Sequence, residues 1–461
     1  MYDLIIIGNG AIGSFVAYNV LERSLDEKFK IAIVGPSDRK YGATVAAGAM
    51  HAVFAELEEF KNGSLEEQLF SLGLRSRKTF EHIFQLAPQI KTADKTIIYL
   101  KNNASEFELR NFQTVKHVAS EYGVLLPFKQ TSDADLIGMN ASKHEDIIKL
   151  DKEYGFDSRE LMRYLDSKIN DSNIELIDAR VTKCRQENNC LSFETNVGTL
   201  KAKKAINALG PLSNSILPPE LQSIRQYQGV GTAFIVKKYM LPEGQRDHVI
   251  RTVNRGGAQC GIHVVPLNSG FYIGAGNYLA VPGEPELRLD TLRYLLDMAS
   301  SEILPQKLAY EMTGSVIQGN RPRSLDGHPI LGATSDSRLV FASAFNRVGL
   351  TCAPAISDLL VGWFLGKQDA FDGYLSWDPN RKPISYVGAK KEFVLSRVSN
   401  AIEHSLIVNT QDQIDLKAEE LSKFYDLASD KIKKQMKFEK DFEIHPDMCG
   451  LLLKELDNAH Q

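Results

Sequence analysis

The chain has 461 residues, a formal net charge of −4, and a composition that is 43% hydrophobic and 24% charged. Such values are typical of a soluble globular protein with room for two domains, and they argue against binding to nucleic acid or to an anionic membrane surface. No apolar run approaches the ~20 residues that a membrane-spanning helix needs. The 5 cysteines are scattered without a Cys-x-x-Cys pair, so we expect a cytoplasmic protein with free thiols.

The first 34 residues predict a dinucleotide-binding unit. Residues 3–7 form an apolar run typical of a buried strand, residues 14–25 have a helical pattern, and residues 30–34 read as a second strand. Between the first strand and the helix stands Gly8-Asn9-Gly10-Ala11-Ile12-Gly13. In such a loop the first glycine makes the tight turn, the second lets the backbone approach a pyrophosphate, and the third lets the helix pack on the strand. The N–H groups at the helix N-terminus then face the phosphates.

One position departs from this pattern. The second strand of such a unit normally ends in an Asp or Glu that holds a ribose hydroxyl, but Gly35 stands at that position here. Ser37 and Asp38 follow in the loop. We expect one of them to reach the ribose instead.

A run of small residues follows the second strand, and it favours FAD over NAD. Residues 41–50 read YGATVAAGAM. Small side chains let a chain pass close to a flat ring system, which an NAD domain does not require at this point. An NAD domain would instead continue into a third strand–helix repeat.

The middle of the chain alternates helical and strand patterns. Ser64 and Glu67 are placed as a capping box at the start of a helix that Pro88 terminates. Helices are predicted at 64–86, 105–122, 158–169 and 287–303, and strands at 97–100, 174–179, 181–184, 190–195, 199–202, 205–208, 228–236, 263–266, 271–276 and 339–342. The strand-rich stretch at 222–280 is typical of an antiparallel sheet.

Three further blocks complete a series of motifs. They are residues 204–213 (KAINALGPLS), 319–332 (GNRPRSLDGHPILG) and 345–355 (FNRVGLTCAPA). In content, order and separation, these blocks and the run at 41–50 resemble the motifs of the D-amino-acid oxidase and glycine oxidase family of flavoproteins. The resemblance covers residues 3 to about 366.

The resemblance implies FAD as the cofactor. Ala46 and Gly319 stand where relatives with covalently attached flavin carry a histidine and a cysteine, so we expect non-covalent binding. Cys352 and His51 lie nearby in the sequence and are expected to be a buried thiol and a loop histidine. Motif and resemblance together predict cofactor contacts from Gly8, Gly10, Ala11, Ile12, Gly13, Ser37, Asp38, Ala43, Thr44, Ala47, Gly48, Met50, Val181, Ala208, Gly210, Arg321, Asn346, Arg347, Val348, Gly349, Leu350 and Thr351.

Two arginines are the predicted catalytic residues. Arg321 matches the family's carboxylate-binding arginine, and Arg347 matches a second arginine of the glycine oxidase branch. A guanidinium group suits this task because its rigid fork binds a carboxylate through two parallel hydrogen bonds. Arg323 is expected to face solvent or the interdomain surface.

The predicted fold is α/β (α+β overall), with a Rossmann-like FAD-binding domain, an inserted antiparallel-sheet substrate domain and a C-terminal helical extension. The FAD-binding domain would comprise residues 1–85, 150–215 and 318–377, and the substrate domain residues 86–149 and 216–317. The extension, residues 378–461, has helical patterns at 392–404, 415–436 and 448–456. We expect it to cover the core or form a subunit interface, and to be needed for solubility or assembly but not for FAD binding.

The function implied is FAD-dependent oxidation of the C–N bond of an amino acid or N-substituted glycine, with oxygen or another acceptor reoxidising the cofactor. Two alternatives remain open. One is an acceptor-linked amine dehydrogenase or tailoring enzyme of the same fold. The other is a flavin-containing, non-catalytic subunit of a hetero-oligomer. The expected ligand is a small amino acid or amine, no nucleic-acid or membrane partner is expected, and homo-oligomerisation is left open.

Overall fold

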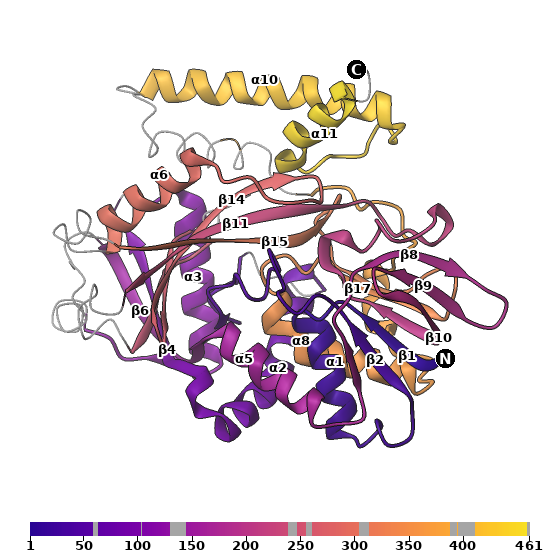
Figure 1. The fold of residues 1–461 in the computed structure, drawn as a ribbon. Coiled ribbons are helices and arrows are strands. Elements are labelled where there is room, and N and C mark those ends of the chain that lie inside the picture. Colours follow the sequence, from indigo (N-terminus) through magenta and orange to yellow (C-terminus); the bar gives the residue numbers. More distant parts are fainter. Residues whose placement is uncertain are drawn as a thin grey trace.

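The computed structural model describes the chain except residues 59–62, 103, 130–143, 238–246, 255–260, 304–312, 388–393, 395–410 and 459–461. Two sheets lie side by side, with two C-terminal helices above them (Figure 1). Among the described residues, the smaller sheet has 8 strands and the larger has 9.

The smaller sheet is the nucleotide-binding type predicted from the first strand–helix–strand unit. Its strand order is β16-β17-β10-β1-β2-β7, and four of its five neighbouring pairs along this order are parallel. The strands are β1 (Tyr2–Ile7), β2 (Ile31–Val34), β7 (Glu175–Ile177), β10 (Gly198–Asn207), β16 (Ile330–Ala333) and β17 (Leu339–Ser343), with the hairpin β8 (Val181–Gln186) and β9 (Leu191–Thr195) joined to β10.

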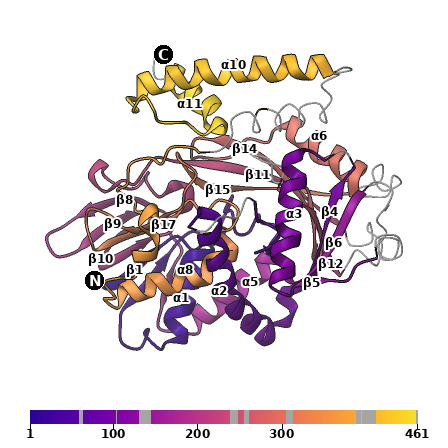
Figure 2. The same cartoon turned by 180° about the vertical axis from the view of Figure 1, so that it is seen from behind.

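Both faces of this sheet are buried, which explains its continuous apolar strands. Leu4 and Ile6 of β1 pack on one side with the helices, and Ile5 and Ile7 pack on the other with the β8–β9 hairpin. The helices on the first side are α1 (Ala11–Glu22), α2 (Leu65–Leu86), α5 (Ser158–Asn170) and α8 (Gly349–Phe364) (Figure 2). Because successive side chains of a strand point to opposite faces of the sheet, the apolar residues of β1 contribute to two separate cores.

The larger sheet is mainly antiparallel, as expected, but it contains one parallel pair, β4 with β12. Its order is β15-β11-β14-β13-β12-β4-β6-β3, with β5 beside β6. The strands are β3 (Met50–His51), β4 (Lys91–Lys101), β5 (Leu125–Leu126), β6 (His144–Phe156), β11 (Gln226–Lys237), β12 (His248–Thr252), β13 (His263–Leu267), β14 (Gly270–Ala280) and β15 (Gly314–Ser324). The helix α3 (Glu106–Glu121) packs beside β4 and β6, and α6 (Leu289–Met298) lies over β14.

The predicted elements are present with shifted bounds, but no individual strand was predicted at β3, β5, β6, β12, β15 or β16. Three predicted features also differ in form. The strands predicted at 199–202 and 205–208 form the single strand β10. The region predicted as one helix at 287–303 contains two elements: the α-helix α6, and after it a π-helical turn, η7 (Ala299–Ile303). At α2 only half of the capping box forms: Ser64 accepts from the backbone N–H of Glu67, but the Glu67 carboxylate accepts from Gly63 instead of Ser64. The short 3-10 helices are η1 (Pro88–Ile90), η3 (Gly210–Leu212), η4 (Pro219–Leu221) and η8 (Asp372–Trp377).

The division into a FAD-binding and a substrate domain stays a prediction, and two of its boundaries fall inside strands. Residue 150 lies within β6, and residue 318 lies within β15. Both strands belong to the larger sheet. A domain boundary that falls inside a strand leaves no mark in the sequence, because the apolar pattern of the strand continues across it.

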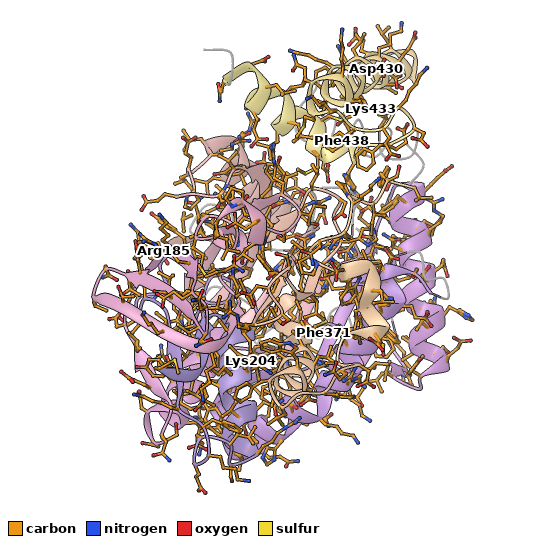
Figure 3. The ribbon with its side chains drawn as sticks, turned by 90° about the vertical axis from the view of Figure 1, so that its right-hand side faces the viewer. Arg185, Lys204, Phe371, Asp430, Lys433 and Phe438 are labelled. Carbon is orange, nitrogen blue, oxygen red and sulfur yellow. The ribbon has the colours of Figure 1, made fainter. Side chains whose placement is uncertain are left out.

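The C-terminal extension is tied to the core by buried contacts. Its helices are α10 (Gln411–Met436) and α11 (Pro446–Asn458), and the pattern predicted at 392–404 falls almost wholly outside the described residues. Met448 and Leu452 of α11 are fully buried in the same apolar cluster as the nucleotide sheet. Figure 3 shows Asp430, Lys433 and Phe438 of this region well separated from Lys204 and Phe371 of the core.

A second attachment of the extension is an ion pair. The guanidinium of Arg381 donates to the carboxylate of Asp326 from Nε (3.0 Å) and Nη2 (2.9 Å), and the Asp326 side chain has no exposed surface. This contact binds the start of the extension to the motif at 319–332.

Arg323 was expected to face solvent or the interdomain surface, and the structure decides between the two. It does not face solvent, because only 8% of its surface is exposed. Its Nη2 lies 3.8 Å from the buried carboxylate of Asp447 at the start of α11. Of the two expected surroundings, solvent is therefore ruled out, and Arg323 lies where the motif at 319–332 meets the C-terminal extension.

Two simple expectations can be compared with the described residues. Cys184, Cys190, Cys352 and Cys449 are free and buried thiols, as expected, and Cys260 lies outside the described ranges. Across the described ranges, none of the helices has the length and apolar character that a membrane span requires.

Candidate functional site

The turn between β1 and α1 has the tight geometry that its glycines predict. Gly8 adopts φ +104°, and a Cβ there would lie 2.5 Å from the backbone oxygen of Ala208. A Cβ on Gly13 would lie 1.9 Å from the oxygen of Gly8. Only glycine fits at either position, so the loop brings β1, α1 and the Ala208 segment into direct backbone contact.

The N-terminus of α1 is suited to an anion. Its N-cap residue, Gly10, offers no side-chain hydrogen bond, and its first turn carries no acidic residue. The backbone N–H of Ala11 donates to Oγ1 of Thr44 at 2.9 Å, while Ile12 and Gly13 complete the first turn. First-turn N–H groups have no partners within their own helix, and they carry the positive end of the helix dipole. The pyrophosphate of FAD fits this position, with Thr44 beside it.

The loop around Ala208 is fixed by the buried side-chain amide of Asn207. Asn207 donates from Nδ2 to the backbone oxygen of Ser213 at 2.8 Å, and its Oδ1 accepts from the backbone of Leu209 at 3.3 Å. Gly210 then turns with φ +62°. The predicted residues Ala208 and Gly210 therefore lie in one fixed loop beside the glycine turn.

The loop after β2 holds Ser37 and Asp38, which were expected near the ribose. Ser37 donates to the carboxylate of Asp178 from its backbone N–H (2.9 Å) and its hydroxyl (2.7 Å). Asp38 accepts from the backbone of Lys40 at 3.0 Å and lies 3.7 Å from Nη2 of Arg180. Asp178 was not recognised from the sequence, because it lies inside the strand predicted at 174–179, whereas β7 ends at Ile177.

Val181 is the first residue of β8 and is partly buried against the nucleotide sheet. It follows Asp178 by three positions. The structure therefore places it at the same edge of the sheet as the loop after β2, and its predicted contact with the cofactor stays a prediction.

The small-residue run at 41–50 passes directly beneath the larger sheet. Gly42 forms an isolated bridge with Asn320 of β15. A Cβ on Gly319 would lie 2.4 Å from Cβ of Ala46, and a Cβ on Gly48 would lie 2.2 Å from the ring of Tyr272. Small residues are thus required here by protein packing, beyond the passage of a flat ring that the sequence suggested.

The run also contacts the helices. Oγ of Ser158 at the start of α5 lies 3.4 Å from the backbone oxygen of Ala47, which follows Ala43 and Thr44 in the same turn. Met50, in β3, accepts from the hydroxyl of Thr351 at 3.2 Å. This contact joins the end of the run to the first turn of α8.

The segment before α8 is strained and fixed. Asn346 adopts φ +48°, and its N–H donates to the backbone oxygen of Pro322 at 3.2 Å. Val348 is the N-cap of α8, and Gly349, Leu350 and Thr351 form its first turn, which carries no acidic residue. The positive end of a second helix dipole thus opens beside the small-residue run. This geometry fits the pyrimidine side of a flavin, where reduction places negative charge.

Arg321 lies on the face of β15 that looks toward the small-residue run, because Gly319, two residues earlier on the same face, is the residue that meets Ala46. Its guanidinium lies along β11, and a Cβ on Gly231 would stand 3.6 Å from its Nε. Nη2 donates to Oδ1 of Asn277 on β14. Glycines on β11 therefore leave room for this long side chain across the sheet.

Arg347 is placed beside two glutamates that sequence reasoning missed. Its Nε lies 3.4 Å from a carboxylate oxygen of Glu56, and its Nη2 lies 3.1 Å from one of Glu58. Glu56 also pairs with the buried Arg251 at 2.7 Å. Burial alone would raise the pKa of Glu56, but Arg251 and Arg347 outweigh it and hold that pKa at about 2. Burial raises the pKa of Glu58, against the opposing effect of Arg347.

His263 of β13 lies among these charged side chains and Arg321. Burial lowers its pKa to about 3, and the neighbouring cations Arg251, Arg321 and Arg347 act in the same direction, against Glu56. Its ring stacks on that of Tyr272 at 5.4 Å. His263 is therefore neutral at physiological pH and cannot serve as a cation for a substrate carboxylate.

A buried carboxylate fixes the loop that carries these glutamates. Glu153 of β6 accepts from the backbone N–H groups of Val53 (2.7 Å), Phe54 (2.9 Å) and Ala55 (3.3 Å). Burial raises its pKa to about 7, although the three hydrogen bonds act in the opposite direction. Little in the sequence indicated this contact, because Glu153 lies in a charged stretch that is typical of an exposed surface.

The structure brings the predicted site residues together in two groups. The phosphate end comprises the β1–α1 turn, Thr44, Ala208 and Gly210, with Ser37, Asp38 and Val181 farther along the sheet edge. The flavin end comprises the small-residue run, the first turn of α8 and the two arginines. A small cavity at this second end is lined by Val53, Glu56, Phe70, Val348 and Thr351, among other residues. Within the described chain, no group of side chains is arranged to hold a metal ion.

Comparison with solved structures finds enzymes of similar fold. Glycine oxidase from Geobacillus kaustophilus superimposes with a TM-score of 0.67 at 18% identity, covering 84% of this chain and 99% of that one. Iminodiacetate oxidase from Chelativorans sp. BNC1 gives 0.66 at 16% identity, with 83% and 100% covered. L-proline dehydrogenase from P. horikoshii gives 0.64 at 16% identity, with 82% and 97% covered.

At these identities the structural likeness shows the fold alone, and no curated protein sequence matches the chain. The family model for FAD-dependent oxidoreductases matches residues 3–363, which include every motif described above. The chain therefore belongs to the family of FAD-dependent oxidoreductases.

Proposed function

We propose that this protein oxidises the C–N bond of a small amino acid or N-substituted glycine, using non-covalently bound FAD. The observation that carries the proposal is the position of Arg321. It projects from the sheet face that covers the small-residue run, and the next residue, Pro322, accepts from the backbone N–H of Asn346 just before α8. FAD bound there would supply the hydride acceptor for the substrate carbon, and water would hydrolyse the resulting imine.

In this proposal Arg321 binds the substrate carboxylate and Asn277 orients the guanidinium. A carboxylate that enters a closed site loses its water and must be paired with a cation. Arg347 is the weaker candidate because Glu56 and Glu58 already balance its charge. We assign Arg347 to holding the two glutamates beside the site.

The proposal that FAD is not covalently attached is supported by the surroundings of the nearby reactive side chains. Burial raises the pKa of Cys352 to about 12, so that its thiol stays protonated. His51 is fully buried and its Nε2 lies 3.1 Å from the backbone oxygen of Gly73. Neither group is a good nucleophile toward the flavin. Acid denaturation should release yellow FAD into the supernatant, and flavin remaining on the precipitate would contradict the proposal.

The substrate class is supported by the proteins of similar fold, whose names include glycine oxidase, iminodiacetate oxidase and L-proline dehydrogenase. All three compounds are small amino or imino acids with a carboxylate. Since both oxidases and a dehydrogenase occur among them, the electron acceptor is a separate question. We favour oxygen, with an acceptor-linked dehydrogenase as the alternative.

One experiment tests the function. The holoprotein is mixed anaerobically with a panel of amino and imino acids, and the flavin absorbance near 450 nm, which roughly marks the oxidised state, is followed. Bleaching by a carboxylate-bearing amine, followed by recovery on admission of air, is the expected result. Bleaching without recovery would indicate the dehydrogenase, and no bleaching by any member would favour the non-catalytic subunit.

A further inference from the structure

The loop after β2 lacks the acidic side chain that normally holds the ribose, and the structure shows why it cannot be restored at that position. A Cβ on Gly35 would lie 2.4 Å from Oδ1 of Asn9. Asn9 is buried, and its Nδ2 donates to the backbone oxygen of Pro36 at 2.9 Å. The side chain of Asn9 thus fills the space that an aspartate or glutamate at position 35 would need.

A different carboxylate reaches this edge of the sheet. β7 pairs with β2 in parallel, with Val34 opposite Ile177, and the N–H of Gly35 donates to the backbone oxygen of Ile177 at 3.1 Å. Asp178 is the next residue, so it leaves the sheet beside Gly35. Parallel strands present their carboxyl ends at one edge, where dinucleotides bind. Asp178 is therefore one strand away from the expected position, on the same edge.

Hydrogen bonds from Ser37 hold the carboxylate of Asp178 close to the loop after β2. Ser37 donates to one carboxylate oxygen through its N–H at 2.9 Å and to the other through its hydroxyl at 2.7 Å. These hydrogen bonds lower the pKa of Asp178, so it stays ionised. An ionised carboxylate has about four acceptor positions, and Ser37 occupies two of them. The side chain is exposed, so its remaining positions can accept from a ligand.

We propose that Asp178, oriented by Ser37, is the residue that accepts hydrogen bonds from the ribose 2′- and 3′-hydroxyls of the adenosine part of FAD. The proposal rests on FAD as the cofactor and is independent of the substrate. It replaces the earlier expectation that Ser37 or Asp38 contacts the ribose directly. Ser37 acts through Asp178, and Asp38 is engaged by Lys40 and Arg180.

The proposal is tested on the full-length apoprotein, without turnover. ADP, 2′,3′-dideoxy-ADP and 2′-phospho-ADP compete with FAD, and displacement is followed by flavin fluorescence. A hydroxyl bonded to a charged group should make ADP bind roughly tenfold or more tightly than the dideoxy compound. In Asp178→Ala this ratio should fall to about one. The control is Asp297→Ala, which removes an exposed aspartate of α6 outside the site and should leave the ratio unchanged.

The third probe separates ribose binding from loop support. A 2′-phosphate is repelled by the wild-type carboxylate, and Asp178→Asn should admit it while keeping a hydrogen-bond acceptor for the loop. If Asp178→Ala weakens ADP and dideoxy-ADP equally, Asp178 only orders the loop and the proposal is wrong. Equal affinity of the wild type for ADP and dideoxy-ADP would also overturn it. Because substrate is absent from every arm, an error in the proposed reaction would not change these results.

Discussion

At the scale of single residues, Arg321 and Arg347 differ in their surroundings, although the motifs present them as a pair. Arg347 pairs with Glu56 and Glu58, whereas Arg321 donates to the neutral amide of Asn277. A guanidinium that already neutralises two carboxylates gains little from a third. The proposal that Arg321 binds the substrate carboxylate leads to a direct test.

Arg321→Ala should lower kcat/KM for a carboxylate-bearing amine by roughly two orders of magnitude or more, because hydrogen bonds to charged groups contribute ~1.5–3 kcal/mol each and ~1.4 kcal/mol is tenfold. Arg321→Lys should recover only part, since a point charge cannot hold a planar carboxylate in one orientation. The flavin spectrum should not change. Arg185→Ala, which removes an exposed arginine of the β8–β9 hairpin (Figure 3), is the control. Near-normal turnover by Arg321→Ala would transfer the assignment to Arg347.

Glu153 gives a prediction for pH. Its pKa is about 7 in the folded protein against a reference value of 4.5. A carboxyl whose pKa is raised by folding contributes stability that is complete below pH 4.5 and is lost as the pH rises through about 7. Glu153→Gln removes this loss, because an amide does not ionise. The melting temperature of the variant relative to wild type should therefore increase between these two pH values.

The control for this titration is Glu284→Gln, whose side chain is 81% exposed. Its melting temperature should follow that of the wild type across the same range. A difference between Glu153→Gln and wild type that does not vary with pH would show that Glu153 does not titrate in this interval.

At the scale of elements, the small-residue run and β15 depend on each other. Gly319 and Ala46 come from motifs more than 270 positions apart, yet a Cβ on Gly319 would overlap Ala46. Two chain segments approach this closely only where one of them lacks a side chain. The run therefore helps to position the sheet that carries Arg321.

Gly319→Ala should push β15 away from the run. Overpacking of this kind typically costs ~1–3 kcal/mol, so we expect a lower melting temperature and a lower flavin content of the purified protein. Gly283→Ala is the matched control, because a Cβ at Gly283 would meet nothing within 4 Å. Full flavin content and unchanged stability in Gly319→Ala would show that the backbone adjusts freely at this contact.

At the scale of the whole molecule, the C-terminal extension is attached through the FAD-binding motifs themselves. Arg381 pairs with the buried Asp326, and Asp447 of α11 lies beside the buried Arg323. From the sequence we expected the extension to be dispensable for FAD binding, and that stays a prediction. The ion pairs add a condition: a cut before Arg381 leaves the carboxylate of Asp326 buried without its cation.

Removing one partner of a buried ion pair commonly costs ~3–5 kcal/mol. We therefore expect a chain ending at residue 387 to retain FAD better than one ending at residue 377. The same contact is isolated by Arg381→Met, which should destabilise the protein, and by the double variant Asp326→Asn with Arg381→Met, which should recover part of the loss. Additive effects of the two substitutions would mean that the pair contributes nothing to stability.

The sequence by itself determined the nucleotide-binding sheet, the order of the motifs and the cofactor family. These features are encoded locally: the glycines of the first turn, the apolar strands and the helical spacing each depend on neighbours within a few residues. The prediction of strands β11, β13 and β14 was also confirmed, because alternating patterns and a Gly-containing turn are local signals.

Only the tertiary structure decided which side chains meet. The approach of Asp178 to Ser37, of Glu56 and Glu58 to Arg347, and of Asp447 to Arg323 each joins residues more than 120 positions apart. Their pairing follows from strand order and helix docking, which carry no local mark in the sequence. A charged residue reads as exposed until its partner is known, because burial of a charge is tolerated only when a partner is present.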